Sequence, residues 1–295
     1  MNATGRIDDA VYVDDVASAN RLYSKGYTGD PQPGNALKLS FIEAAYAQQE
    51  GRLDTGATLA ELLALAGPRA EVDYLVYRDL RERGLVTRHN GDAFDVWKRA
   101  ETPKQPKWFT CHPHGERQAL RPEDLQEGVL SVADDDGVVT HYWTTPVEPE
   151  GTVPLGHMAP CKGTKLDHRV LVDGAIGEHM GTPVGNQTIL SLTEAAALQA
   201  RGILSLEETL QPLHLETYED LRKRGVVTKS GFRFGTHFRG YSADPHKVHA
   251  RWLIQCMDRP MDWSHISRAV RLAHGVKKEF LIANNGYWHL DWFRP

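Results

Sequence analysis

The sequence has few cysteines and lacks long apolar segments. Its three cysteines, Cys111, Cys161 and Cys256, lie far apart in a chain of 295 residues. Such spacing gives no disulfide framework and fits a reducing compartment. No run approaches the ~18 apolar residues of a membrane helix, and the N-terminus lacks the basic start and apolar centre of a signal peptide. We therefore expect a cytoplasmic protein that does not associate with membranes.

A cluster of metal-ligating residue types occurs at Cys111, His112 and His114. A zinc site there would need a fourth ligand from a distant segment, such as Cys161, and no CxxC pair accompanies it. We expect a loop without a metal ion at this cluster, and no metal or cofactor elsewhere.

The chain also lacks an excess of positive charge. Its formal net charge is −5, with 41% hydrophobic and 25% charged residues, as in an ordinary soluble globular protein. Nonspecific binding of nucleic acid needs clustered cations, which this balance does not favour. Short basic segments remain as candidate contacts at residues 162–165, 221–225 and 271–278.

Internal repetition is the main feature that is present. Residues 34–53 align with residues 185–204. Each segment contains a serine followed three residues later by a glutamate, a capping box that starts a helix, and a glycine that ends it. These residues are Ser40, Glu43 and Gly51 in the first segment and Ser191, Glu194 and Gly202 in the second.

A second pair of segments, residues 77–97 and 218–241, repeats the same unit. Each predicts a basic helix ending at a glycine, a short strand, a glycine-containing turn and an aromatic strand. A fainter match between residues starting at Ser131 and at Leu281 predicts a hairpin in each copy. The helix-ending glycines are Gly84 and Gly225, and the turn glycines are Gly91 and Gly231.

These matches predict an α+β protein built from two tandem diverged repeats. Each repeat should have an N-terminal lobe of helices and short strands, and a C-terminal lobe with strands, a late helix and a closing hairpin. The expected divisions are an N-terminal lobe at 1–93, a C-terminal lobe at 94–147, a linker at 148–167, and the two lobes of the second repeat at 168–234 and 235–295.

Comparing the copies shows which titratable side chains occur only once. Tyr241 stands where the first copy has Trp97, and the hairpin alignment places Gly128 opposite Lys278. His249, expected to begin an apolar strand, has no clear counterpart. An indole cannot exchange a proton as a phenol does. We expect the first copy to be catalytically silent.

Tyrosine, histidine and lysine together can cleave RNA without a metal ion. The ribose 2'-OH attacks phosphorus if one group removes its proton, another protonates the leaving 5' oxygen and a cation stabilises the charge. Imidazole suits the acid role near neutral pH, and an ammonium group suits the phosphate oxygens. A phenol is a poor base at neutral pH unless cations such as Arg239 or Lys278 favour its ionised form.

At these residues the sequence resembles the archaeal tRNA-splicing endonucleases, from near Val11 to the C-terminus. The resemblance implies a nuclease-like C-terminal lobe, in which a mixed sheet is flanked by helices. It also implies that Tyr241 is the base, His249 the acid and Lys278 the charge-stabilising group. Ala250 replaces a serine that often follows the histidine. The matching elements are YEDLRKRG at 218–225, GFRFG at 231–235, FRGY at 238–241, DP at 244–245, His249 and RLAHGVKK at 271–278.

The resemblance further implies a metal-independent enzyme whose substrate is precursor tRNA with a bulge-helix-bulge at the intron boundaries. Two chains would form a homodimer in which an acidic loop docks on the partner's catalytic repeat. Asp134, Asp135 and Asp136 resemble that loop. Arg271 would hold a flipped base together with a second side chain, for which Trp292 and Arg294 remain alternatives.

Two other readings follow from the residues. A non-catalytic RNA-binding subunit of the same assembly would be expected to lack one of the three side chains. A Mg²⁺-dependent DNA nuclease would need paired carboxylates near Lys278, which the sequence does not provide. His246 is an alternative acid, but the apolar segment following His249 favours the latter.

Overall fold

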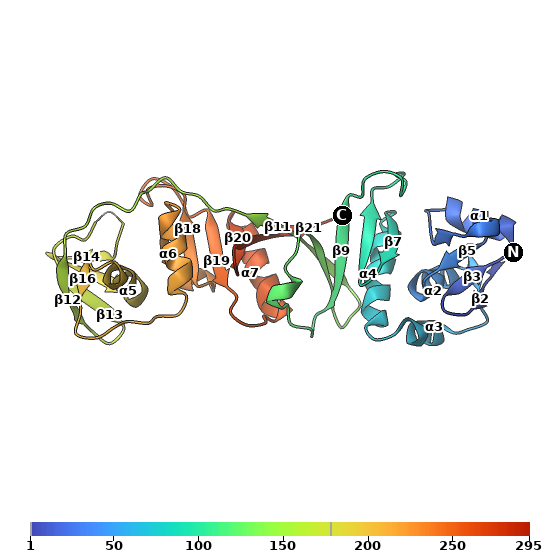
Figure 1. The fold of residues 1–295 in the computed structure, drawn as a ribbon, viewed down its shortest axis with the longest axis horizontal. Coiled ribbons are helices and arrows are strands. Elements are labelled where there is room, and N and C mark those ends of the chain that lie inside the picture. Colours follow the sequence, from blue (N-terminus) through green and yellow to red (C-terminus); the bar gives the residue numbers. More distant parts are fainter. Residues whose placement is uncertain (1, 178) are drawn as a thin grey trace. The chain divides into compact units, whose positions relative to one another are not determined.

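The computed structural model describes residues 2–177 and 179–295 and separates them into two compact units. The first unit runs to Thr145 and includes Pro260–Ile266 and Asp291–Pro295, whereas the second comprises Pro146–Arg259 and Ser267–Leu290. Figure 1 gives the order of the elements along the chain. Within the described ranges, no helix combines the length and apolar character needed to cross a bilayer.

The N-terminal lobe of the first unit contains a four-stranded antiparallel sheet in the order β2-β3-β5-β4. A separate parallel pair joins β1 to β6. Alternating apolar residues on β3 and β5 are buried and form the core with the helices. The elements are β1 (Ala3–Thr4), β2 (Arg6–Ile7), β3 (Val11–Val13), α1 (Val16–Ser24), β4 (Asp30–Pro31), η1 (Pro33–Asn35), β5 (Leu37–Leu39), α2 (Phe41–Gln49), β6 (Leu53–Asp54) and α3 (Leu59–Ala66).

The C-terminal lobe of this unit has five strands in the order β7-β8-β9-β10-β11, in which β9 and β10 are parallel and the other neighbours antiparallel. The predicted late helix is wrong for this unit. The connection at 116–127 is short and contains Pro122, and it forms only the 3-10 turn η2. The elements are α4 (Ala70–Glu82), β7 (Val86–Asn90), β8 (Ala93–Trp97), β9 (Phe109–Gly115), η2 (Pro122–Asp124), β10 (Gly128–Ala133) and β11 (Val139–Val147).

The N-terminal lobe of the second unit contains a five-stranded sheet in the order β14-β15-β13-β12-β16. Strand β12 falls within the residues expected to be a linker. Its sequence, CKGTK, is polar and mostly exposed, but its backbone pairs with both β13 and β16. The elements are β12 (Cys161–Lys165), β13 (Arg169–Asp173), β14 (Thr182–Val184), β15 (Gln187–Ser191), α5 (Leu192–Ala200) and β16 (Leu204–Ser205).

The C-terminal lobe of the second unit repeats the strand pattern of the first. Its order is β17-β18-β19-β20-β21, again with one parallel pair, β19 and β20. Here the crossover between the parallel strands is a full helix, α7. The elements are α6 (Leu215–Lys223), β17 (Val227–Ser230), η3 (Phe232–Phe234), β18 (Phe238–Tyr241), β19 (Trp252–Cys256), α7 (Trp263–Gly275), β20 (Glu279–Ala283) and β21 (Tyr287–Phe293).

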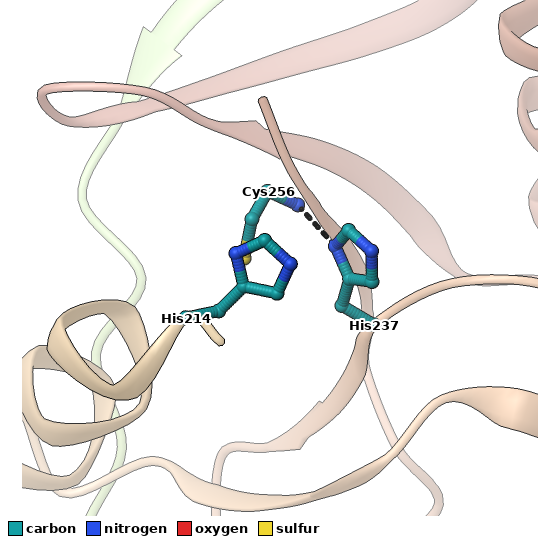
Figure 2. Close-up of side chains that lie close together, drawn as sticks. All are labelled: His214, His237 and Cys256. Atoms are coloured by element: carbon teal, nitrogen blue, oxygen red, sulfur yellow. Dashed lines mark hydrogen bonds between the residues drawn. The ribbon is translucent and has the colours of Figure 1, made fainter. Parts of the chain in front are cut away.

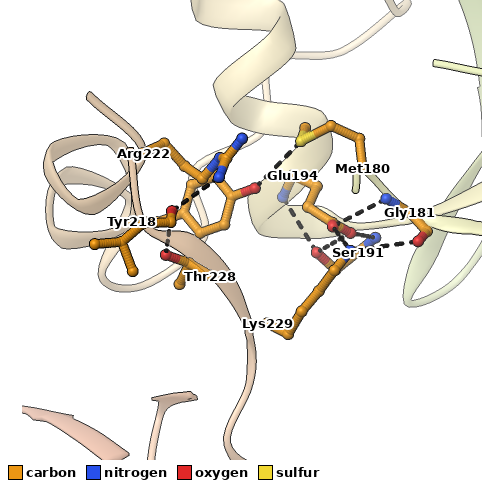
Figure 3. Close-up of polar contacts among 9 residues, drawn as sticks. Met180, Gly181, Ser191, Glu194, Tyr218, Arg222, Thr228 and Lys229 are labelled. Atoms are coloured by element: carbon orange, nitrogen blue, oxygen red, sulfur yellow. Dashed lines mark hydrogen bonds and ion pairs between the residues drawn. The ribbon is translucent and has the colours of Figure 1, made fainter. Parts of the chain in front are cut away.

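The predicted capping boxes are confirmed at Ser40 with Glu43 and at Ser191 with Glu194. Each glutamate is buried and also accepts a hydrogen bond from a distant glycine amide, that of Gly29 or Gly181. In the second unit, Lys229 completes the arrangement with an ion pair of 2.9 Å to Glu194 (Figure 3). Burial opposes the charge, but this ammonium and the amide donors lower the pKa of Glu194.

Candidate active site

Strands β18, β19 and β20 bring two of the expected catalytic residues to one sheet edge. Gly240 pairs with Trp252, and Trp252 pairs with Glu279. Tyr241 directly follows Gly240 and ends β18, whereas Lys278 directly precedes Glu279, the first residue of β20. Because the end of β18 meets the starts of β19 and β20, the backbones of Tyr241 and Lys278 flank the start of β19.

His249 lies in the loop that leads to this edge, three residues before β19 rather than at its first residue. The Lys278 Nζ donates a hydrogen bond of 2.8 Å to the carbonyl of Ala250, the residue after His249. His249 is exposed, while Tyr241 and Lys278 are half-buried. The lysine is thus attached to the segment that carries the histidine, and all three side chains originate at one edge.

Neighbouring contacts fix this edge. Glu279 forms an ion pair of 2.9 Å with Arg251 and accepts a hydrogen bond of 2.9 Å from the Trp252 indole. The absence of a side chain at Gly240 lets Trp252 pack across β18, since a Cβ there would lie 3.1 Å from the indole. The guanidinium carbon of Arg239 is 5.7 Å from the Tyr241 ring centroid, which places positive charge beside the phenol.

Strand register shows what occupies the place of Tyr241 in the first unit. Tyr241 pairs with Val227 on β17, and Trp97 pairs with Val86 on β7. The Trp97 indole donates a hydrogen bond of 2.8 Å to the carbonyl of Gln105. This position in the first unit therefore holds a group that only donates hydrogen bonds.

The residue of the first unit that is equivalent to Lys278 is not the one given by the hairpin alignment. The register through β8, β9 and β10 puts Gln126, rather than Gly128, at the position of Lys278. The sequence alignment is displaced by two residues because each strand of the hairpin in the first unit continues two residues further toward the turn than its counterpart in the second. The pairs that define this register are Phe94 with Cys111 and Cys111 with Val129 in the first unit, and Phe238 with Ile254 and Ile254 with Leu281 in the second.

Comparison with known proteins identifies the family. A family model described as tRNA intron endonuclease, N-terminal domain, matches residues 7–61, and one described as tRNA intron endonuclease, catalytic C-terminal domain, matches residues 212–285. Proteins named tRNA-splicing endonuclease are similar over nearly the whole chain. That of Methanococcoides burtonii is 30% identical, covering 94% of this chain and 94% of the relative. That of Natronomonas pharaonis is 32% identical, covering 95% and 94%.

The chain belongs to the tRNA-splicing endonuclease family. The resemblance inferred from the motifs is thereby confirmed. The family's catalytic-domain match spans Tyr241, His249 and Lys278, and its N-terminal-domain match lies in the first unit. A further relative, from Haloferax volcanii, is 31% identical and covers 98% of this chain and 97% of its own.

In this member of the tRNA-splicing endonuclease family, the three consecutive aspartates form the turn between β10 and β11. The Asp134 carboxylate accepts hydrogen bonds from the backbone amides of Asp136 and Val138, at 3.1 and 2.8 Å. Asp135 forms an ion pair with Arg117. Asp134 therefore shapes the turn, whereas Asp135 and Asp136 are exposed at its tip.

The expected RNA-binding residues belong to different units. Arg271 is exposed on α7 in the second unit. Trp292 and Arg294 lie in the C-terminal segment of the first unit, and the guanidinium carbon of Arg294 is 4.4 Å from the Trp292 ring centroid. The structure thus brings the two alternative partners of Arg271 together with each other.

Cys111, His112 and His114 lie in strand β9, so the expectation of a loop there is wrong. Side chains on a strand alternate between faces, which points Cys111 and His112 in opposite directions. The Cys111 Sγ contacts the Ser131 Oγ at 3.0 Å, and His112 contacts Gln126. These residues are not among the metal-compatible groups found in the part of the chain that the structure describes.

The buried Ser131 belongs to a series of polar side-chain contacts that was not predicted from the sequence. The Ser131 Oγ lies 2.7 Å from Nδ1 of His141, and the Nε2 of His141 lies 2.8 Å from a carboxylate oxygen of Asp79 on α4. Although this order resembles a serine-hydrolase triad, Ser131 is fully buried and His141 is 2% exposed. No substrate can reach the serine, so we assign the chain of contacts to packing α4 on the sheet.

Two groups of side chains that could bind a metal ion were also not predicted from the sequence, because each group combines residues from distant segments. One consists of His214, His237 and Cys256 (Figure 2), and the other of His179, Asp244 and His246. In the first, the backbone amide of Cys256 donates a hydrogen bond of 3.0 Å to Nδ1 of His237. Burial and the neighbouring His214 lower the pKa of His237, which favours the neutral imidazole.

Proposed function

We propose that this protein is an endoribonuclease that cleaves precursor tRNA at bulge-helix-bulge intron boundaries. The observation that carries the proposal is the edge formed by β18, β19 and β20, where Lys278 binds the backbone next to His249 and Tyr241 ends the adjacent strand. Membership of the tRNA-splicing endonuclease family, with the catalytic-domain match over this edge, supports the substrate class.

The proposed reaction is an internal transesterification. The phenolate form of Tyr241 accepts the proton of the ribose 2'-OH, whose oxygen attacks phosphorus. His249 donates a proton to the 5' oxygen as its bond to phosphorus breaks, and Lys278 stabilises the charge on the nonbridging oxygens. The products are a 2',3'-cyclic phosphate and a 5'-hydroxyl. The proposed reaction consumes no water and uses no metal ion.

Two features support the separate roles. The Arg239 guanidinium lies beside the Tyr241 ring, so a positive charge stands next to the group proposed as the base. The hydrogen bond from Lys278 to Ala250 uses one of three ammonium donors and leaves two for phosphate oxygens. Each positioned proton-transfer group contributes roughly 10²- to 10⁴-fold to the rate.

We also propose that the two units are tandem repeats, of which only the second is catalytic. Their C-terminal lobes share one strand order with one parallel pair, and their N-terminal lobes share the buried capping glutamate. The first repeat holds Trp97 and Gln126 at the register positions of Tyr241 and Lys278. Neither side chain provides an ionisable group for the reaction.

The wider assembly follows from the same proposal. Two chains form a cytoplasmic homodimer, and the exposed Asp135 and Asp136 of one chain dock on the catalytic repeat of the other. A flipped RNA base stacks on Arg271, an interaction that contributes about 1 to 3 kcal/mol per base. Sedimentation at working concentration tests the dimer, and a monomeric active species would contradict it.

The direct test is single-turnover cleavage of a bulge-helix-bulge RNA by the wild type and by His249→Ala, with binding measured separately by fluorescence anisotropy. We expect cleavage to fall by at least roughly 100-fold while binding changes little. His168→Ala, at an exposed histidine in the same unit, is the matched control. Wild-type protein that binds this RNA without cutting it would instead indicate a non-catalytic subunit.

A further inference from the structure

His179, Asp244 and His246 form a cluster outside the proposed catalytic groups. Each offers one ligand atom, and these atoms all lie within 4.8 Å of one another. The Nε2 of His179 is 3.7 Å from Oδ1 of Asp244. His179 comes from the turn before β14, whereas Asp244 and His246 come from the loop that leads to His249. The cluster therefore joins the N-terminal lobe of the second unit to its catalytic loop.

The spacing of the two imidazoles fits a shared ion. A ring centroid lies about 3 Å from a metal bound to its nitrogen, so two rings on one ion have centroids about 5 to 6 Å apart. The rings of His179 and His246 are 5.9 Å apart, with planes inclined by 44°. Because His246 is exposed, rotation of its side chain can bring its nitrogen to bonding distance.

The carboxylate is already oriented. The backbone amide of His246 donates a hydrogen bond of 2.9 Å to Oδ1 of Asp244, and the exposed Lys247 lies 3.5 Å from Oδ2. A hydrogen bond to a ligating carboxylate is the usual outer-shell support of a metal site. The Lys247 contact is a weak surface ion pair that an ion can displace.

The other cluster lacks these features. The rings of His214 and His237 have centroids 4.0 Å apart and planes inclined by 31°, and this separation is too short for two ligands of one tetrahedral ion. In addition, Nδ1 of His237 already accepts the amide of Cys256 (Figure 2). A neutral imidazole that accepts at one nitrogen carries its proton on the other, so it has no lone pair for a metal.

The backbone turn that carries His179 occurs in both units, whereas the histidine side chain occurs only in the second. His179 has a left-handed backbone with φ of 65°, and it precedes by two residues Gly181, whose amide binds the buried glutamate. In the first unit, Tyr27 has φ of 56° and precedes Gly29 in the same way. The turn thus recurs in both units, but only the second has an imidazole there.

We propose that His179, Asp244 and His246 bind one transition-metal ion of the Zn²⁺ or Co²⁺ class. Two imidazoles and one carboxylate are a common ligand set for such ions, with water completing the coordination. The ion ties the loop before His249 to the N-terminal lobe of the same unit. It supplies no group to the cleavage reaction, and the proposal stands whether or not the protein cleaves RNA.

The test uses the full-length protein after chelation and desalting. Titration with Co²⁺, followed by visible absorption and calorimetry, should show one tightly bound ion per chain that Zn²⁺ displaces. His179→Ala and His246→Ala should each weaken binding by more than about 100-fold, since even outer-shell changes cost 10- to 100-fold. Zn²⁺ should also raise the melting temperature of the wild type but of neither variant.

The controls separate this site from other histidines. His168→Ala and His214→Ala should bind Co²⁺ as the wild type does. Equal melting temperatures of the metal-free wild type and His246→Ala would show that the variant is folded. The proposal is overturned if His179→Ala and His246→Ala retain full affinity, if His214→Ala removes the binding, or if the wild type binds no Co²⁺ at micromolar concentration.

Discussion

The ammonium nitrogen of Lys278 lies 2.8 Å from the carbonyl oxygen of Ala250. This hydrogen bond connects the residue before β20 to the segment before β19, where His249 lies. A substitution at Lys278 therefore removes a positive charge and also one tether of the histidine loop.

Lys278→Met should lower the single-turnover cleavage rate by roughly 10²- to 10³-fold, because the transition state loses a preorganised cation. RNA binding should weaken much less. Lys277→Met is the matched control, since Lys277 is exposed and adjacent, and its rate should stay within about 2-fold of the wild type. Equal losses from both lysines would point to general electrostatic attraction of RNA instead of a positioned group.

Tyr241→Phe should lower the cleavage rate by roughly 10²- to 10⁴-fold, because the phenol oxygen that accepts the 2' proton is gone while the ring remains. Trp97→Phe changes the equivalent register position of the first unit and should leave the rate constant unaffected once folding is confirmed by circular dichroism. Comparable cleavage by Tyr241→Phe and the wild type would remove Tyr241 from the mechanism.

Lys229→Met should destabilise the protein by about 3 kcal/mol, because it leaves the carboxylate of Glu194 buried without its cation. The register-equivalent Arg88 donates to the carbonyl of Gly29 and pairs with the exposed Asp30, so Arg88→Met should cost only about 1 kcal/mol. Urea unfolding of the two variants measures the difference. Equal costs would show that the Glu194 ion pair adds no stability of its own.

The buried His114 should make the free energy of unfolding depend on pH. Burial lowers the pKa of His114 to about 4, whereas the unfolded chain binds that proton near pH ~6.5. Between these values the unfolded state binds more protons, so stability falls as the pH falls, by at most about 1.4 kcal/mol per pH unit from this group. His114→Phe should reduce the slope measured by urea unfolding between pH 6.5 and about 4.5.

The matched control for that measurement is His168→Phe, at an exposed side chain, which should keep the wild-type slope. An unchanged slope in His114→Phe would mean that other groups cause the loss of stability in acid.

Local chemistry made much of the fold predictable. The serine and glutamate of each capping box fix a helix start within four residues, and glycines at Gly84 and Gly225 adopt the positive φ that ends the preceding helix. The turns at Gly91 and Gly231 and the closing hairpins also follow from short-range signals. Tyr241 ends β18, the aromatic strand expected at the close of residues 218–241, for the same reason.

What the sequence missed depends on pairing between distant segments. Strand β12 is polar and becomes a strand only through its neighbours β13 and β16. The equivalence of Gln126 and Lys278 is visible only in the strand register. A difference in hairpin length shifts the sequence alignment but does not change which residues pair between strands. The contact of His179 with Asp244 likewise joins residues far apart in the chain, which no spacing rule detects.

End-group determination of the cleaved RNA tests the central claim most directly. A bulge-helix-bulge RNA cut by the wild-type protein in the presence of EDTA should yield a 2',3'-cyclic phosphate and a 5'-hydroxyl, and a single 2'-deoxy nucleotide at the cleavage site should stop the reaction. Products with a 5'-phosphate, or unimpaired cutting of the deoxy substrate, would contradict attack by the ribose hydroxyl and the roles given to Tyr241, His249 and Lys278.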